Sequence, residues 1–498
     1  MPGRSAPGTV VRPALPGPTC NGVTVFTPQD PVLHLLRRAT YGPTPAAEAE
    51  IREIGTASWL NRQLAPSTID DSACDALLTR YPLISADITT IRAKVKAGTL
   101  KFGAWDAMQQ LGSAAVARAA WSRRQLLEIM VDVWSNLLNV TCPMGEVWDS
   151  RTGYDTLIRK HALGRFADLL KATATAPAML SYLDNRSSTK AKPNENYARE
   201  LMELHTVGLI YTEADVKDAA RLLTGLTVDK TTGLYRFDAT QHATGAVTIL
   251  GWRHDNATAG GGEAAALAFV EMLALHPATA ERVARRLCVR FVADDPPPAL
   301  VSRLQQVYVQ QKSAIVPVLR ALFASPEFAA STGAKVRTPF EDLVAAVRVL
   351  GLQPEASGTD GVRGLYNYLV DAGHAPMRWS PPNGYPDVAA AWTAPSGLLV
   401  RWNAHLNLAA GWYPKQLVRP ASMLTALVPK LPATHGAFLD ALTTRLVGTT
   451  LQPAHRDALL AFLGKTAASP LKATDPAAAG RLPHLIALVL DSPYFLAR

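Results

Sequence analysis

Apolar residues recur every three or four positions along most of the chain, which is the spacing of one buried face of an α-helix. Helix-start signals precede several of these stretches. Asp30-Pro31 and Thr44-Pro45 each combine a capping side chain with a proline at the first helical position. The same periodicity predicts one long helix from about residue 114 to residue 138. The pattern as a whole predicts a mainly α, multi-helix globular fold.

Residues 226–262 interrupt this helical pattern. Residues 226–228, 235–237 and 247–250 are rich in β-branched and aromatic side chains and are separated by turn residues. They predict a small irregular or β insertion. A run of three glycines at 260–262 closes the insertion, but it fits neither a GxGxxG motif nor a P-loop, so it predicts a loop rather than a nucleotide site.

Composition and charge narrow the class of protein. The chain has 498 residues, of which 48% are hydrophobic and 18% charged, and this is typical of a globular protein with a large core. The net charge is +9, but lysine and arginine are dispersed, without the basic block and interleaved aromatics of a nucleic-acid surface. We therefore expect no nucleic-acid partner. No apolar run of about 18 residues occurs, so we expect no membrane span.

The N-terminus and the cysteines add two expectations. Proline and glycine predict a flexible lead-in over residues 1–29, followed by the helical domain. This segment lacks the apolar core of a secretory signal, so the location of the protein stays open. The four cysteines, at positions 20, 74, 142 and 288, lie far apart without CxxC spacing. They predict buried free thiols rather than a zinc site.

The stretch PNENYARELMELHTVG, residues 193–208, predicts a helix with one polar stripe. Asn194 is a suitable cap after Pro193. An α-helix turns by about 100° per residue, and this places four side chains in the stripe: Asn196, Arg199, Glu200 and Glu203. His205 then points almost opposite Glu203. The stretch also lacks the i,i+4 histidine pair of a metal-binding helix.

Two interpretations of this stripe stay open. In the structural interpretation, it is a solvated face with a local Arg199–Glu203 pair, worth about 0.2–0.5 kcal/mol. In the functional interpretation, the stripe is buried and Arg199 keeps one carboxylate ionised, while Glu200 or Glu203 acts as a base or a metal ligand. Spacing alone favours the structural interpretation.

Other polar residues are candidates for ligand binding. Asp184-Asn185 lies at a predicted helix end, where oxygen ligands suit Mg²⁺ or Ca²⁺, although both residue types are also common in turns. A divalent metal is therefore a candidate cofactor. The remaining candidates are His34, Arg38, His161, Asn194, Asn196, Asp215 and Arg221.

Several stretches together resemble the bacterial domain-of-unknown-function 1800 family. They are HLLRRATYGPT (34–44), HALGRFADLL (161–170), PAMLSYLDN (177–185), PNENYARELMELHTVG (193–208), YTEADVKDAARLLTGLTVD (211–229), HPATAERVARRLCVRFV (276–292) and SPEF (325–328). The resemblance covers roughly residues 30–410 and implies one helical domain there. Residues 411–498 are then expected to form a C-terminal helical segment packed on it.

The family has no established activity to carry over. Its members are often exported, and their genes often adjoin one for a sulfatase- or alkaline-phosphatase-like protein, which the resemblance implies as a partner. Relatives often have histidines in motifs such as FWHNHF, where this chain has Ser135 and Leu137. If those histidines bind a metal in relatives, this chain has lost ligands. Many relatives have Phe in place of His205, which implies that His205 is not the chemical residue.

Two hypotheses follow. The leading one is an enzyme or degenerate enzyme that acts on an envelope or extracellular substrate. Its site would be one polar cluster that unites the stripe with the candidate ligand-binding residues, with Arg199 and Arg38 as anion clamps. The alternative is a non-catalytic helical scaffold that binds a partner, in which the polar cluster is a structural ion-pair network.

Overall fold

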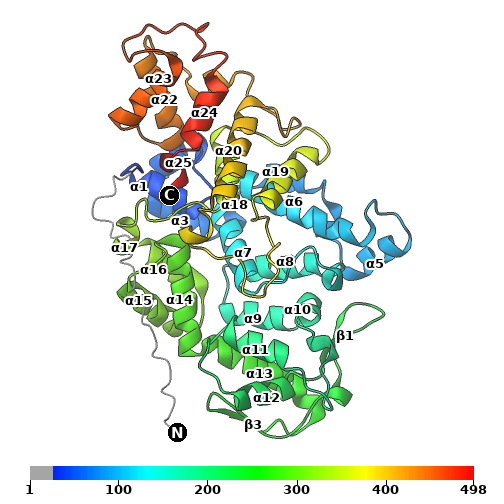
Figure 1. Ribbon diagram of the computed structural model, residues 1–498. Helices are drawn as coiled ribbons and strands as arrows, with labels where there is room; N and C mark the ends of the chain where they lie inside the picture. Colours follow the sequence, from blue (N-terminus) through cyan, green and yellow to red (C-terminus); the bar gives the residue numbers. More distant parts are fainter. Residues whose placement is uncertain (1–25) are drawn as a thin grey trace, which may run out of the picture.

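The computed structural model describes residues 26–498 and confirms the mainly α-helical fold with a small β insertion (Figure 1). Most of the predicted lead-in, residues 1–25, lies outside the described residues. The first helices are α1 (Pro31–Ala39), α2 (Pro45–Ile54), α3 (Thr56–Gln63), α4 (Ser72–Leu78), α5 (Ile88–Lys96), α6 (Asp106–Trp121) and α7 (Gln125–Leu137). They are followed by α8 (Arg151–His161), α9 (Phe166–Ala174), α10 (Pro177–Tyr182), α11 (Glu195–Glu203) and α12 (Glu213–Leu222).

The insertion separates these helices from the rest of the chain. It consists of β1 (Leu226–Val228), β2 (Tyr235–Phe237), β3 (Val247–Ile249) and β4 (Trp252–His254), which pair as two antiparallel hairpins, β1 with β2 and β3 with β4. The next helices are α13 (Gly262–Leu275), α14 (Pro277–Phe291), α15 (Pro298–Gln310), α16 (Ile315–Phe323), α17 (Pro326–Ala329), α18 (Pro339–Val349), α19 (Asp360–Asp371) and α20 (Pro395–Ala410). The last are α21 (Met423–Leu427), α22 (His435–Val447), α23 (Pro453–Leu463), α24 (Leu482–Leu490) and α25 (Pro493–Leu496).

Local start signals were sufficient to place the first helices. The Asp30 carboxylate accepts hydrogen bonds from the backbone of residues 32 and 33, and Thr44 accepts one from residue 47. In each helix a proline occupies the first turn, where its missing N–H has no helical partner to lose. Both predicted helix starts are confirmed.

The prediction of one long helix over residues 114–138 is wrong. The chain forms α6 and α7 with a break at Ser122, whose backbone is extended. The Asp71 carboxylate holds the break open, because it accepts hydrogen bonds from the Ser122 hydroxyl at 2.7 Å and from the Arg123 backbone N–H at 2.6 Å. Neither glycine nor proline marks this break, and its partner lies far away in the sequence.

The C-terminal segment returns to the start of the chain. Helices α22, α23 and α24 form one end of the molecule, the hairpins lie at the opposite end, and α25 lies beside α1 (Figure 1). Two short helices that begin with Ser-Pro meet α1 there. His34 Nε2 lies 2.8 Å from the carbonyl oxygen of Phe328 in α17, and Arg37 donates to the carbonyl of Ala497, just after α25, at 2.9 Å.

Two expectations from composition can be compared with the described residues. Cys74, Cys142 and Cys288 are buried free thiols, as predicted, and Cys20 lies outside the described part. Every helix within residues 26–498 is too short or too polar to span a lipid bilayer.

A buried ion-pair network joins the middle of the chain to its end. Glu341, in the first turn of α18, forms ion pairs with Arg290 of α14 at 2.7 Å and with Arg498 at 3.2 Å. Lys335 lies 3.1 Å from Asp387, in the segment between α19 and α20. Burial opposes ionisation of Glu341, but Arg290 and Arg498 outweigh it and lower its pKa. The network therefore fixes segment 374–387 against α14 and α18.

A second buried cluster links α18, α20 and the end of α24. Asp342 lies 2.9 Å from Arg401 and 3.0 Å from His405 Nε2, while His405 Nδ1 lies 2.8 Å from Asp491. Burial alone would lower the pKa of His405, but the two carboxylates raise it to about 9. His405 is thus a buried imidazolium at neutral pH.

This cluster predicts a pH-dependent stability. The folded pKa of His405 lies above the usual value of 6.5, so its contribution is fully present below pH 6.5 and is lost as the pH rises through about 9. Urea denaturation should show a loss on the order of 3 kcal/mol across this window. His405→Gln should remove the step, and His484→Gln, at an exposed position on α24, should retain it. An unchanged step in His405→Gln would contradict the assignment.

Candidate functional site

Helix α11 carries the polar stripe. The Asn194 side chain accepts a hydrogen bond from the Asn196 backbone N–H at 2.9 Å and caps the helix, as predicted. Apolar side chains bury one face of α11: Tyr197, Ala198, Leu201 and Met202. The stripe itself is exposed at Asn196 and half-buried at Arg199, Glu200 and Glu203. It is a partly solvated face of the helix.

Arg199 forms different ion pairs from the predicted one. Its guanidinium donates to both carboxylate oxygens of Glu213 in α12, at 2.8 and 2.9 Å, and it lies 3.3 Å from Glu195. The predicted pair with Glu203 is wrong, because Arg199 extends toward α12 rather than along its own helix. Its hydrogen bonds to Glu213 raise the pKa of Arg199. Arg199 thereby joins α11 to α12.

The two stripe glutamates differ in their surroundings. Glu203 accepts a hydrogen bond of 2.5 Å from the Tyr211 hydroxyl. Burial raises the pKa of Glu200, the charge of Glu203 raises it further, and Arg199 opposes both. The charge of Glu203 also acts on Arg282 of α14, whose pKa it raises against the effect of burial.

His34 and Arg38 lie in α1, away from the stripe. His34 packs against Phe328, and burial followed by the charge of Arg38 lowers its pKa to about 4, so the imidazole is neutral. Arg38 is fully buried and donates to the carbonyl of Ser331 at 2.5 Å. The expectation of one polar cluster that includes these residues is therefore wrong. Their burial comes from the packing of α1 against α17 and the segment that follows it.

Three other predicted residues tie α12 to the β insertion. Asn185 is fully buried and donates to the carbonyls of residues 223 and 226 at 3.2 and 3.0 Å. Asp215 forms a capping box with Thr212 and accepts a hydrogen bond of 2.7 Å from the backbone of residue 250. Arg221 donates to Asp218 at 3.0 Å and to the carbonyl of residue 244 at 3.1 Å. All three roles are structural contacts.

Asp184 and His161 are also separate from the stripe's charged residues. Asp184 is exposed, has a left-handed backbone with φ of 58°, and receives the Asn194 amide on its carbonyl at 3.0 Å. His161 ends α8, and burial followed by the charge of Lys160 lowers its pKa. In the described part of the chain, neither residue belongs to a group of three or more His, Cys, Asp or Glu side chains that could hold a metal ion.

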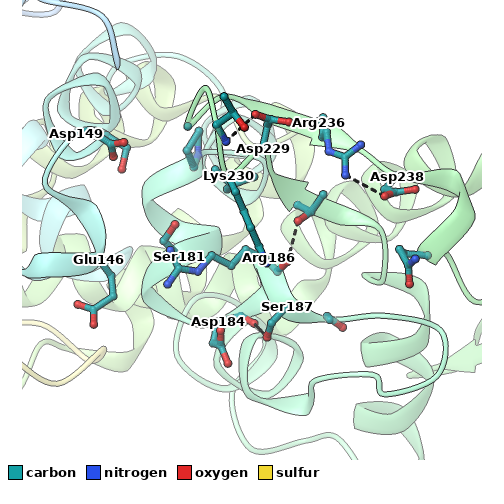
Figure 2. A pocket seen from close by; sticks show the side chains of 18 of the residues that line it. Glu146, Asp149, Ser181, Asp184, Arg186, Ser187, Asp229, Lys230, Arg236 and Asp238 are labelled. Carbon is teal, nitrogen blue, oxygen red and sulfur yellow. Dashed lines mark hydrogen bonds and ion pairs between the residues drawn. The ribbon is translucent and has the colours of Figure 1, made fainter. Parts of the chain in front are cut away.

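Asp184 lines a wide polar cleft of about 1140 Å³, called here the hairpin cleft, between the start of α8, the end of α10 and the β1–β2 hairpin. Figure 2 shows its charged side chains, with Arg236 paired to Asp238 at 3.0 Å. Asp149 is paired with Arg92 at 2.6 Å, and Asp229 accepts backbone hydrogen bonds within its own turn. Asp149, the buried carboxylate of the hairpin cleft, is therefore compensated by an arginine of the protein itself.

A second cavity, of about 470 Å³, contains charged side chains that are not all paired. We call it the α7–α14 cavity, because α7 and α14 form two of its walls; the turn after α11 and segment 374–387 complete it. The ionisable side chains that line it are Asp132, His205, Arg282, Arg285, Arg286, Arg290, His374 and Asp387. These residues come from four separate parts of the sequence.

Asp132 is the carboxylate on the α7 wall. It accepts a hydrogen bond from the Asn136 amide, one turn later, at 3.2 Å. Burial raises the pKa of Asp132 to about 6, against the lowering effects of Arg290 and Arg286. A carboxylate with this pKa is ionised at neutral pH yet is basic enough to accept a proton from a ligand.

Two neutral histidines line the same cavity as Asp132. His205 is buried, and burial followed by the charges of Arg286 and Arg282 lowers its pKa to about 3. His374 stacks on Trp392 with ring centroids 4.4 Å apart, and burial lowers its pKa to about 3. Within residues 26–498, neither His205 Nε2 nor His374 Nδ1 has a hydrogen-bond partner. His205 therefore lines the cavity, and the expectation that it is not the chemical residue stays a prediction.

Two arginines of this cavity have no ion-pair partner among residues 26–498: Arg282, whose guanidinium donates to the carbonyl of Leu204 at 3.2 Å, and Arg286. Arg290 is paired with Glu341, and Arg285 lies 3.8 Å from Glu281. The Arg286 side chain forms no hydrogen bond or ion pair with any residue from 26 to 498, and only burial and more distant charges shift its pKa. Burial lowers its pKa to about 10, although the charges of Asp387 and Asp132 oppose this. A half-buried guanidinium without a partner is well suited to bind an anion.

Segment 374–387 closes the cavity because it is pinned to α7. The Asn136 side chain accepts a hydrogen bond from the Tyr385 backbone at 3.1 Å. Gly384 has φ of 69°, and a Cβ added there would overlap the backbone carbonyl of Asn136. The Asn139 amide donates to the carbonyls of residues 379 and 381 at 2.9 and 2.7 Å. Asn136 thus positions both Asp132 and the opposite wall.

The two positions where relatives have histidines face different cavities. Leu137 lines the α7–α14 cavity, whereas Ser135 lines a small internal cavity of about 30 Å³. Asp132 lines both. No group of three His, Cys, Asp or Glu side chains in residues 26–498 is arranged to hold a metal ion.

The sequence did not identify Asp132, Arg286 or His374 as candidate site residues. Each lies in an ordinary helix or loop without a neighbouring catalytic motif. The family resemblance offered one signal. Arg286 lies within the matching stretch 276–292. The two positions at which relatives have histidines, 135 and 137, lie about one helical turn from Asp132. The rigid loop at 381–386 was a second signal, since such a loop often closes a site.

The comparisons with known proteins agree with the motifs. No curated protein and no solved structure matches the chain. One family model does match, over residues 34–497, which extends the similarity beyond residue 410 and through the C-terminal helices. The chain therefore belongs to the family described as Protein of unknown function (DUF1800).

Proposed function

We propose that this chain is an enzyme-like domain that binds an anionic group in the α7–α14 cavity. Arg286 would hold the anion, Asp132 would exchange a proton with the bound molecule, and His205 would supply a neutral hydrogen-bonding nitrogen. The observation that carries the proposal is the unpaired Arg286 guanidinium beside a carboxylate of raised pKa. Residues 1–25 contain neither Asp nor Glu, so they offer no side-chain carboxylate to pair with it.

The residues that line the cavity restrict the chemical class of ligand that it could bind. Guanidinium groups bind the oxygens of carboxylate, sulfate and phosphate in a planar two-point arrangement. The wall around Arg286 also contains the aromatic rings of Trp379 and Tyr385. We therefore propose an organic molecule that bears one such anionic group. An envelope or extracellular substrate, and a sulfatase- or alkaline-phosphatase-like partner, remain predictions from the family resemblance.

The stripe residues take a smaller part in this proposal. Glu200 and Glu203, predicted as base or ligand, do not line the cavity, but the charge of Glu203 acts on Arg282, which does. They would tune the electrostatic potential at its edge. Arg199 is engaged by Glu213, and Arg38 is buried in α1, so neither is free to act as the anion clamp there.

The alternative is a non-catalytic scaffold. The buried network around Glu341 favours it, because such networks define how helices are arranged without any chemistry. The network explains the burial of Arg290, but it leaves Arg286 without a partner. An anion site beside the network would account for the paired Arg290 and for the unpaired Arg286.

The first test of this proposal uses Arg286→Gln. Inorganic sulfate and phosphate should raise the melting temperature of the wild-type protein and bind in calorimetric titrations. Loss of the unpaired guanidinium should weaken binding by about tenfold or more, since a charged hydrogen bond is worth about 1.5–3 kcal/mol. Arg303→Gln, which removes an exposed arginine of α15, is the matched control and should bind as the wild type does. Equal affinities in both variants would contradict the proposal.

The second test concerns pH. Protonation of Asp132, with its pKa of about 6, removes a negative charge from the cavity, so sulfate should bind more tightly as the pH falls from 7.5 to 5. His205 and His374 do not titrate in this range, because their pKa values lie near 3. Asp132→Asn should bind sulfate about tenfold more tightly at pH 7.5 and show no such pH dependence.

The same substitution should change stability in a defined direction. A buried carboxyl whose folded pKa is raised stabilises the fold below its usual pKa of 3.8, and this contribution is lost as the pH rises through about 6. Asp132→Asn should therefore melt at a higher temperature than the wild type at pH 7.5. A lower melting temperature together with unchanged sulfate affinity would favour the scaffold alternative.

A further inference from the structure

Another cavity, of about 640 Å³, lies where the first helices meet the C-terminal segment. Helices α1, α2, α18 and α22 supply most of its wall, and Phe495 of α25 completes it; we call it the α1–α22 cavity. It joins the first and last parts of the described chain, and it shares no lining residue with the α7–α14 cavity.

Three arginines line this cavity without a carboxylate partner. Arg37, Arg337 and Arg445 form no ion pair with any residue from 26 to 498. Arg37 and Arg337 are 5% and 2% exposed, so their charges are almost removed from water. Such burial is unfavourable unless the charge is compensated.

The carboxylates of the same cavity are already engaged. Asp30 and Glu48 both bind Arg52, at 2.5 and 2.7 Å, and Asp440 binds Arg456 at 2.8 Å. The sequence of residues 1–25 contains no acidic side chain that could compensate the arginines. The two buried charged side chains of the lining, Arg37 and Arg337, are thus both positive.

Structural contacts account for part of this arrangement. Arg37 donates to the carbonyl of Val447, the last residue of α22, at 2.6 Å, which is favourable at a helix C-terminus. Its Nε is nevertheless buried without a hydrogen-bond partner among the described residues. Arg337 stacks on Phe495, with its guanidinium 4.6 Å from the ring centroid, and Arg445 donates to the carbonyl of Val349 at 2.9 Å. None of these contacts is an ion pair, although the charges of Asp342 and Glu341 raise the pKa of Arg337, and that of Glu48 raises the pKa of Arg445, against the effect of burial.

The two buried guanidiniums also repel each other. Burial followed by the charge of Arg337 lowers the pKa of Arg37 to about 9. A bound anion would relieve both effects, because it would compensate the buried charge and screen the repulsion. The rest of the wall is apolar, with Leu33, Ala345, Val349 and Leu446 among its residues.

We propose that the α1–α22 cavity is a second binding site, for an organic phosphate or carboxylate whose apolar body lies against this wall. Arg37, Arg337 and Arg445 hold the anionic group. Because these residues come from α1, the start of α18 and α22, the ligand fastens the C-terminal helices to the first helix. The site is independent of the function proposed for the α7–α14 cavity.

The test uses phenyl phosphate, inorganic phosphate and phenol as probes, titrated into the full chain by calorimetry. Arg286→Gln serves as the background, because it removes the anion contact of the other cavity. Phenyl phosphate should bind this background more tightly than inorganic phosphate does, and phenol should bind most weakly. Binding that phenol matches, or no binding by phenyl phosphate at millimolar concentration, would overturn the proposal.

Arg445→Gln identifies the site. Arg445 is half-buried and makes one hydrogen bond to a carbonyl, so its loss should leave the fold intact while weakening phenyl phosphate binding about tenfold. Arg62→Gln, on the exposed face of α3, is the control of equal charge and should bind as its background does. Arg37→Gln tests the buried anchor; if it fails to fold, Arg445→Gln alone decides. Equal affinity in Arg445→Gln and Arg62→Gln would overturn the site.

The result also separates the two proposals. Arg445→Gln in the wild-type background should retain the sulfate binding of the α7–α14 cavity. Loss of phenyl phosphate binding when Arg445→Gln is added to Arg286→Gln then supports this site. Loss only in Arg286→Gln supports the α7–α14 cavity and overturns this one.

Discussion

The pairing of Glu341 with Arg290 and Arg498 is the interaction on which the rest of the structure depends. It joins α14, α18 and the last residue of the chain in a region without solvent. An unpaired charge in such a region is strongly unfavourable, so each member constrains where the others lie. The same carboxylate caps α18 through Thr338, and a local helix signal is thereby coupled to long-range packing.

The network also explains why one cavity wall exists. Lys335 and Arg290 draw Asp387 toward the network, and this holds segment 374–387 over α7. The segment brings His374 and Tyr385 toward Asp132 and Arg286. Arg290 is satisfied by the network, whereas Arg286, one helical turn earlier on α14, is left to face the cavity. The division between a structural and a free arginine on one helix is the basis of the proposed anion site.

Much of the fold was predictable because it follows from neighbouring residues. Helix caps at Asp30, Thr44 and Asn194 act over three positions, and the β insertion was marked by turn residues on both sides. The break between α6 and α7 was not predictable, because it depends on Asp71, which approaches only in the folded chain. The predicted Arg199–Glu203 pair is wrong for the same reason. Glu203 is near Arg199 in the sequence, but packing of α11 against α12 brings Glu213 to the guanidinium.

The sequence by itself determined the family, the helical class and the position of the polar stripe on α11. The motifs, the 3.6-residue periodicity and the caps are all local properties. Only the tertiary structure decided which charges are compensated. Arg199 forms an ion pair with Glu213, whereas Arg286 and Arg37 line cavities in which no carboxylate among residues 26–498 forms an ion pair with them. Burial and pairing depend on segments far apart in the chain, so no reading of one helix could assign them.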